Sequence, residues 1–192
     1  MGNLRSVEKA VEAVGGSPTI SGDPDSVRKA ERLILPGVGA FGDAMHNLKR
    51  HGLDKAVIDA VQGGKPLLGL CLGLQLLFTE SEEFGSHEGL NLIPGKVRKF
   101  DETDLRVPHV GWNQIEGTRR DPLLAGIPEG SYFYFVHSFY VEPEKSDYIL
   151  CWTTYGRRFC SIACRDKVWG AQFHPEKSQD AGKRLLRNFM FL

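Results

Sequence analysis

Apolar and polar positions follow a distinct pattern in the first half of the chain. Short, continuous apolar runs at 32–35 and 66–70 predict buried strands. Between them, and before the first run, apolar residues recur every three or four positions, which predicts helices at 4–14, 40–50 and 53–61. Buried strands that alternate with helices are typical of a parallel sheet with helices on both faces.

Beyond about residue 92 the pattern changes to strands joined by short turns. The segments expected to form strands are 96–100, 109–115, 132–141, 148–155, 158–164 and 168–174. A last helix is expected from about Gln179 onward. With no internal repeat or linker, residues 1–192 are predicted to form one α/β domain, with a mostly parallel central sheet, flanking helices and an antiparallel portion.

The amino end departs from this scheme, because the chain opens with the helix at 4–14. A doubly wound domain normally opens with a buried strand, on which the first helix can dock. We therefore expect a first strand of about ten residues encoded upstream of Met1. After the helix, residues 17–21 predict a short strand, and Asp23 before Pro24 predicts the cap of a brief helix.

Composition excludes several classes of partner. Lysine plus arginine equals aspartate plus glutamate at 24 each, so no overall field favours nucleic acid or an anionic membrane. The longest apolar stretch, 66–78, is too short and too interrupted by glycine to span a bilayer. Four cysteines without a CxxC pair predict a reduced, cytoplasmic protein. Cys160 and Cys164 are expected on a strand face, and no metal or other cofactor is expected.

Candidate chemistry begins with GLCLG at residues 69–73, which lies between a predicted strand and a predicted helix. G-x-C-x-G at such a junction is a nucleophile elbow, in which glycines allow a sharp turn and close packing. The N-terminus of the following helix favours a thiolate and a developing oxyanion. Cys71 is therefore a candidate nucleophile, and its alternative role is a small buried hydrophobic residue.

FHPE at residues 173–176 supplies a candidate base. His174 ends an apolar strand, and ligands of parallel sheets bind where strands end. Glu176 lies two residues on, so that in an extended chain its carboxylate points the same way and orients the imidazole. Cys71, His174 and Glu176 are thus predicted to form a catalytic triad.

PGVG at residues 36–39 ends another buried strand. Its glycines let backbone N–H groups turn towards a ligand, and an ordinary strand-to-helix turn is the alternative. We expect the N–H groups of Val38 and Leu72 to form an oxyanion hole beside Cys71.

Together these motifs resemble those of the class I glutamine amidotransferases. PGVGAF, GLCLGLQLLF, PHVGWNQ, YFVHSFY and QFHPEKS are similar to the glutaminase subunits of imidazole glycerol phosphate synthase, across essentially the whole chain. GLC and HPE would also suit amidotransferases of other pathways, whereas GWN and YFVHSFY favour the histidine pathway. Family members also begin with the short apolar strand that this sequence lacks before GNLRS.

The resemblance implies hydrolysis of glutamine to glutamate and ammonia through a cysteine thioester. It also implies binding of glutamine by Gly39, Gln75, Ser138 and Phe139.

The resemblance further implies a heterodimer with a (βα)₈-barrel synthase subunit, which uses the ammonia to make imidazole glycerol phosphate and AICAR. Trp112, Tyr134 and Lys177 match positions of the family's docking face, and burial in the core is the alternative for the two aromatic residues. A non-catalytic binding module with the same fold is the rival of a different class, and the intact triad argues against it.

Overall fold

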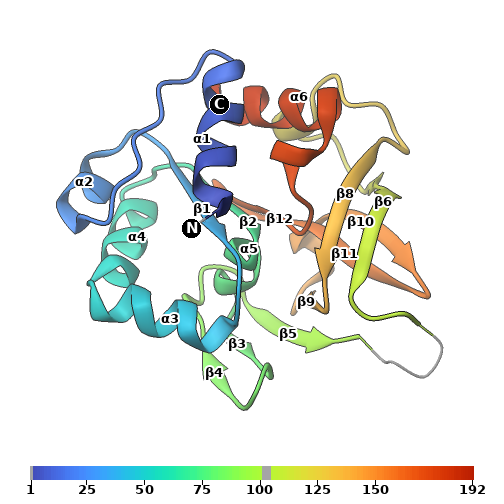
Figure 1. Ribbon diagram of the computed structural model, residues 1–192, viewed down its shortest axis with the longest axis horizontal. Helices are drawn as coiled ribbons and strands as arrows, with labels where there is room; N and C mark the ends of the chain where they lie inside the picture. Colours follow the sequence, from blue (N-terminus) through green and yellow to red (C-terminus); the bar gives the residue numbers. More distant parts are fainter. Residues whose placement is uncertain (1, 101–104) are drawn as a thin grey trace.

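The computed structural model describes residues 2–100 and 105–192, which form one α/β body (Figure 1). The α-helices are α1 (Gly2–Ala13), α2 (Pro24–Lys29), α3 (Phe41–Arg50), α4 (Leu53–Gln62), α5 (Leu72–Leu76) and α6 (Gln179–Met190). The strands of the first half are β1 (Leu33–Gly37), β2 (Leu67–Cys71), β3 (Glu80–Ser81), β4 (His87–Glu88) and β5 (Gly95–Lys99). Those of the second half are β6 (His109–Gln114), β7 (Glu116–Gly117), β8 (Tyr132–His137), β9 (Phe139–Pro143), β10 (Ile149–Tyr155), β11 (Arg157–Arg165) and β12 (Val168–Ala171). Short 3₁₀ helices are η1 (Pro122–Leu124), η2 (Ser146–Tyr148) and η3 (Pro175–Lys177).

The large sheet is mixed, with the strand order β1-β2-β12-β11-β9-β5-β3-β4, and β10 and β7 attached beside β11. Its parallel pairings are β1 with β2, β2 with β12, and β3 with β5, and the other pairings are antiparallel. Of the two strands off the main order, β10 pairs with β11, and β7 pairs with β10. A separate two-stranded sheet pairs β6 with β8. Because β1, β2 and β12 run parallel, their carboxyl ends meet at one edge, where the site is built.

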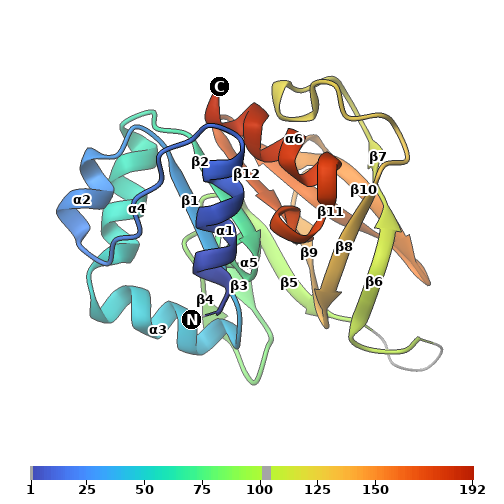
Figure 2. The same ribbon diagram turned by 45° about the horizontal axis from the view of Figure 1, so that its top comes forward.

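Strand β2 separates two hydrophobic cores, because successive side chains on a strand point to opposite faces. Leu68 and Leu70 pack with α1 and α6, through residues such as Val11 and Leu186. Leu67 faces the other way and packs with residues of α3, α4 and α5. Figure 2 shows α1 and α6 in front of the strands, and α3 and α4 to the side. Helices thus cover both faces of the parallel strands.

Most predicted elements are confirmed, including the α/β class, the helices before and after β1, and the strands of the second half. Asp23 caps α2 as predicted, since its side chain accepts a hydrogen bond from the Ser26 N–H. The strand predicted at 17–21 is wrong: these residues carry no regular structure. Ile20 is exposed, and no strand of the described residues pairs with this segment. Local β-propensity is not enough to form a strand that has no neighbour to pair with.

Candidate active site

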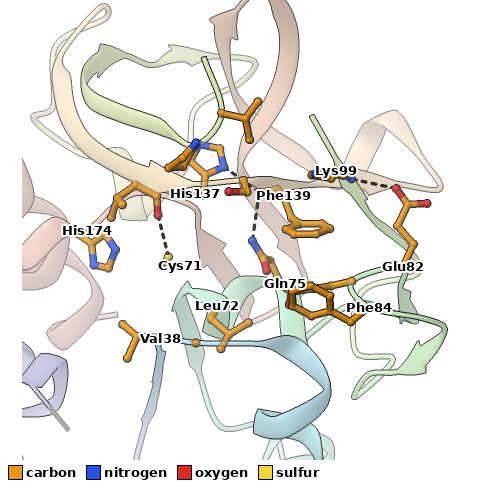
Figure 3. A pocket seen from close by; sticks show the side chains of 16 residues that line it. Val38, Cys71, Leu72, Gln75, Glu82, Phe84, Lys99, His137, Phe139 and His174 are labelled. Carbon is orange, nitrogen blue, oxygen red and sulfur yellow. Dashed lines mark hydrogen bonds between the residues drawn. The ribbon is translucent and has the colours of Figure 1, made fainter. Parts of the chain in front are cut away.

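Cys71 lies at the junction of β2 and α5, as the G-x-C-x-G motif predicts. Its backbone has φ of 54° and ψ of −110°, a conformation that L-residues rarely adopt and that marks a nucleophile elbow. The residue is 8% exposed and lines a cavity of about 940 Å³ (Figure 3). The Sγ atom lies 3.9 Å from the Val136 carbonyl oxygen and 3.9 Å from the Gln172 side-chain nitrogen.

The strand register explains why distant motifs converge on Cys71. Gly37 of β1 pairs with Cys71, so the PGVG segment leaves its strand beside this cysteine. On the other side of β2, Ala171 of β12 pairs with Leu70, so that Gln172 and His174 follow at the same edge. The cavity is accordingly lined by Cys71 and His174, together with Val38 and Gly39.

His174 and Glu176 form a buried pair. The His174 Nδ1 atom lies 2.8 Å from Glu176 Oε1, and the two side chains are 2% and 0% exposed. The second oxygen, Oε2, is buried without a hydrogen-bond partner in the described part of the chain, which leaves the imidazole to balance the carboxylate. Burial opposes the charged imidazole, but the neighbouring Cys71 thiol and Glu176 carboxylate outweigh it and raise the pKa of His174 to about 9.

The path of the backbone between these two residues differs from the prediction. His174 precedes the 3₁₀ helix η3, so Glu176 lies on a helical turn rather than on an extended strand. The carboxylate therefore reaches the imidazole because the chain folds back after Pro175, which opens that turn. The contact was expected from spacing in a strand, and the expected geometry was wrong although the contact forms.

The predicted oxyanion and glutamine-binding residues are gathered in the same cavity. Val38, Gly39, Leu72, Gln75, Ser138 and Phe139 all line it. Gly39 has a φ of +101°, a region that favours glycine and that lets the PGVG backbone turn sharply at the cavity. Leu72 is the first residue of α5, so its N–H is one of those that lack a partner within the helix.

Several lining residues were not singled out from the sequence, namely Glu82, Glu83, Phe84, Lys99, Val107, Pro108, Val136 and His137. Glu83 also bonds the start of α3, since its carboxylate lies 2.6 Å from the backbone nitrogen of Phe41, which donates to it. A run of acidic residues usually indicates a solvent-exposed surface, so the sequence did not indicate that Glu82 and Glu83 line a cavity. His137 did give one: it follows Phe133 and Phe135 on the buried side of an alternating strand.

The predicted docking residues lie close together outside the cavity. Trp112 and Tyr134 pair across β6 and β8, with ring centroids 6.0 Å apart. The Lys177 ammonium lies 5.7 Å from the centre of the Tyr134 ring. Trp112 is 46% exposed and Tyr134 is partly exposed, so neither belongs to the core, the alternative that the sequence left open.

Residues 7–192 match the family model described as glutamine amidotransferase class-I. This chain belongs to the class I glutamine amidotransferase family. The predicted family and fold are thereby confirmed. Among the described residues, no three histidine, cysteine or acidic side chains lie close enough to hold a metal ion. None of the described helices is both long enough and apolar enough to cross a membrane.

Curated relatives resemble the chain over almost its whole length. The imidazole glycerol phosphate synthase subunit HisH of Syntrophotalea carbinolica is 52% identical, over 98% of this chain and 95% of the relative. The HisH subunit of Salinibacter ruber is 50% identical, over 100% of this chain and 91% of the relative. Identity at this level over whole chains confirms that the chain is a glutamine amidotransferase subunit, as predicted.

Solved structures support the same fold at lower identity. A crystal structure of a glutamine amidotransferase superimposes with a TM-score of 0.78 at 20% identity, covering 99% of this chain and 93% of that one. The crystal structure of a protein from Thermoplasma acidophilum, described as a GMP synthase component, gives 0.71 at 18% identity, covering 98% and 86%. These likenesses concern the fold alone.

Proposed function

We propose that this chain hydrolyses glutamine to glutamate and ammonia, with Cys71 as nucleophile, His174 as proton carrier and Glu176 as the residue that orients His174. The observation that carries the proposal is the meeting of a strained cysteine elbow with a buried His–Glu pair in one cavity. The Cys71 sulfur and the Glu176 carboxylate outweigh the effect of burial and keep His174 protonated at neutral pH, since its pKa lies at about 9. The thiolate is the reactive form of a cysteine nucleophile, and the imidazolium offers it an opposite charge.

In the first half-reaction, the Cys71 sulfur bonds to the carboxamide carbon of glutamine and pushes the carbonyl electrons onto oxygen. The N–H groups of Val38 and Leu72 would hold that oxyanion. When the C–N bond breaks, His174 gives its proton to the leaving nitrogen, which departs as ammonia. A γ-glutamyl thioester and a neutral imidazole remain.

In the second half-reaction, water attacks the thioester carbon, and His174 takes a proton from the water. The C–S bond then breaks, which regenerates the Cys71 thiolate and the imidazolium and releases glutamate. Glu176 transfers no proton in either half, because it only holds the ring and stabilises its charge.

The lining of the cavity suits the ammonium group of an amino acid. Gln75, Ser138 and Phe139 line it together, and so does Gly39, the last residue of PGVG. Glu83 adds a carboxylate to the lining, which suits the ammonium group of a substrate. We assign glutamine binding to Gly39, Gln75, Ser138 and Phe139 on this placement and on the family resemblance.

We further propose that the ammonia passes to a (βα)₈-barrel synthase subunit, in a heterodimer that makes imidazole glycerol phosphate and AICAR in the cytoplasm. Free ammonia would become ammonium in neutral water and lose its nucleophilicity. Transfer without release requires that the partner cover the cavity mouth. The curated relatives are named as subunits of imidazole glycerol phosphate synthase, which favours this partner over those of other amidotransferases.

The outer face of β6 and β8 suits that docking. Val110, Trp112 and Tyr132 are apolar side chains that are about half exposed on it. On the same face Val136 pairs with Val110, and Val136 also lines the cavity. The apolar face is therefore continuous with the site, and an exposed patch of this kind is typical of protein interfaces.

The proposal is tested by glutamate release from the chain mixed with its synthase partner and the acceptor nucleotide. Cys71→Ala should lower the rate by about 10⁴-fold or more and leave partner binding intact, because the side chain is small and the fold does not rest on it. Loss of His174 should be nearly as severe, and loss of Glu176 milder. Cys164→Ala, at another buried free cysteine, is the control.

Two results would overturn the proposal. Substantial glutamate release by Cys71→Ala would remove the cysteine from the chemistry. No glutamate release by the wild-type complex would favour a non-catalytic binding module. The identity of the synthase that co-purifies with the chain would show to which pathway the amidotransferase belongs.

A further inference from the structure

Two histidines that the mechanism does not use lie buried beside the active site. His109 of β6 and His137 of β8 pair directly across the two-stranded sheet, and they are 3% and 6% exposed. The Nδ1 atom of His109 lies 2.9 Å from the Nε2 atom of His137. Two buried imidazoles in contact need a defined set of protons, because two donors or two acceptors cannot face each other.

The backbone determines which nitrogen carries each proton. His137 Nδ1 lies 2.8 Å from the Phe139 carbonyl oxygen, which can only accept, so Nδ1 carries a proton. In a neutral ring His137 Nε2 then accepts, and His109 Nδ1 must donate to it. His109 Nε2 accepts in turn, from the Asn113 amide nitrogen 3.3 Å away. The hydrogen bonds run in one direction, from Asn113 to the Phe139 carbonyl.

A second proton on either ring would break this chain. It would place an N–H of His109 against the amide of Asn113, or an N–H of His137 against that of His109. Burial also lowers the pKa of His109 to about 4 and that of His137 to about 3. Both rings are therefore neutral at the pH of catalysis, and the pair is suited to hold a position rather than to move protons.

The histidine pair contacts the backbone at the bend between β8 and β9. Figure 3 shows hydrogen bonds from His137 and from Gln75 meeting at the Phe139 carbonyl, where the Gln75 nitrogen lies 3.2 Å from the oxygen. The same Gln75 nitrogen lies 3.3 Å from the side-chain oxygen of Gln172, whose nitrogen faces the Cys71 sulfur. Both N–H groups of Gln75 are thus used inside the protein, and its amide can offer a ligand only its oxygen.

We propose that His109 and His137 are positioning residues for the glutamine site: they fix the Phe139 carbonyl, and this carbonyl orients Gln75 so that it presents an acceptor to a substrate N–H. The inference rests on the proposed glutaminase function and deepens it. It also links the docking sheet to the pocket wall, because Asn113 follows Trp112 on β6.

The first test is spectroscopic and does not depend on activity. Long-range ¹H–¹⁵N correlation spectra of the purified chain, with each histidine assigned by substitution, report which ring nitrogen carries the proton. Both His109 and His137 should be protonated at Nδ1 and unprotonated at Nε2 at pH 7. A proton on Nε2 of either ring, or a doubly protonated ring, would overturn the inference.

The second test is kinetic and uses the complex with the synthase subunit. His137→Phe keeps a buried ring but removes the donor to Phe139, so KM for glutamine should rise about tenfold while kcat changes by less than about threefold. His137→Asn keeps a side-chain N–H near the Nδ1 position and should recover part of the loss. His109→Phe leaves the donor to Phe139 in place and should raise KM by about threefold; it also serves if His137→Phe fails to fold.

Phe159→Leu is the matched control, because this buried ring packs against both histidines but makes no hydrogen bond to them. KM that is unchanged in both histidine-to-phenylalanine variants, or raised equally by Phe159→Leu, would overturn the inference. A wild-type complex without glutamate release would instead overturn the proposed function, and the proton positions would still test the hydrogen-bond chain.

Discussion

Cys71 and His174 both depart from the state that their residue types usually adopt. The Cys71 backbone has a positive φ of 54°, and strain of this kind persists only where surrounding structure imposes it. The His174 imidazole, although buried, has a pKa raised to about 9, since the thiol and the Glu176 carboxylate outweigh its burial. Perturbed backbone and perturbed pKa in one cavity are the physical marks of a reactive site.

The charge of Glu176 should set the alkaline limit of activity. Against the effect of burial, the Cys71 sulfur and the Glu176 carboxylate together raise the pKa of His174, so the imidazolium that would protonate the leaving nitrogen is lost only as pH rises through about 9. Glu176→Gln removes that charge and should move the alkaline limb of kcat/KM down by about one pH unit or more. The measurement is a pH profile of glutamate release by the complex.

Glu144→Gln, which neutralises an exposed carboxylate, is the control and should leave the profile unchanged. An alkaline limb that stays in place in Glu176→Gln would show that the carboxylate does not act through the charge of His174.

At the scale of elements, the nucleophile elbow depends on close approach between α5 and the strands on either side of it. A Cβ added at Gly73 would lie 1.8 Å from the Leu35 carbonyl oxygen of β1. One added at Gly69 would lie 2.6 Å from the Gly73 carbonyl oxygen. Both glycines of G-x-C-x-G are therefore required by packing against backbone, which cannot move aside as a flexible side chain can.

Gly73→Ala should destabilise the fold by about 3 kcal/mol or more, because the overpacked methyl group must push β1 and α5 apart. The displaced strand carries PGVG, so activity should fall as well. Gly22→Ala is the control: its Cβ meets nothing within 4 Å and its φ lies outside the left-handed region. Denaturant unfolding of both variants measures the difference, and equal stability would contradict the packing argument.

On the scale of the whole molecule, hydrogen bonds join the proposed docking face to the turn that carries His174. The His174 backbone nitrogen lies 2.9 Å from the Tyr134 carbonyl oxygen, to which it donates. The Tyr134 N–H donates to the Ser178 hydroxyl, which in turn donates to the His174 carbonyl oxygen. A partner that presses on Tyr134 therefore acts on the backbone that carries His174.

We predict that the chain alone hydrolyses glutamine very slowly and that its synthase with acceptor nucleotide activates it strongly. PGVG would act as the gate, since rotation of one peptide at Val38 supplies or withdraws an oxyanion donor, worth on the order of a hundredfold in rate. Lys177→Ala should cut that activation by about tenfold yet change stability by less than about 1 kcal/mol, the usual range for an exposed cation–π contact.

Lys145→Ala is the matched control, because it removes a similar contact between Lys145 and Tyr148. The measurement is the ratio of glutaminase rates with and without the synthase. Full activity of the purified chain alone would refute the gate and indicate a free-standing amidase.

Short motifs were enough to predict the chemistry proposed for this chain. A glycine-flanked cysteine between strand and helix, a histidine near a strand end and PGVG at the end of another strand are features of a few consecutive residues. Cys71 lies at its predicted junction, whereas His174 lies three residues beyond the end of β12 rather than on it. Local patterns also predicted most helices and strands. They failed at 17–21, where propensity alone gave a strand that has no neighbour to pair with among the described residues.

Contacts between residues that lie far apart in the chain became known only from the folded structure. The pairing of β6 with β8 leaves Trp112 exposed and brings His109 into contact with His137. The sequence did not predict this, because the register of two strands depends on residues far apart in the chain. The turn of η3 brought Glu176 to His174 along a path that spacing did not predict. The burial of a side chain and the direction of its hydrogen bonds are fixed only when the strands pair. The proposed positioning role of His109 and His137 therefore depends on the folded structure, whereas the triad was predicted from motifs.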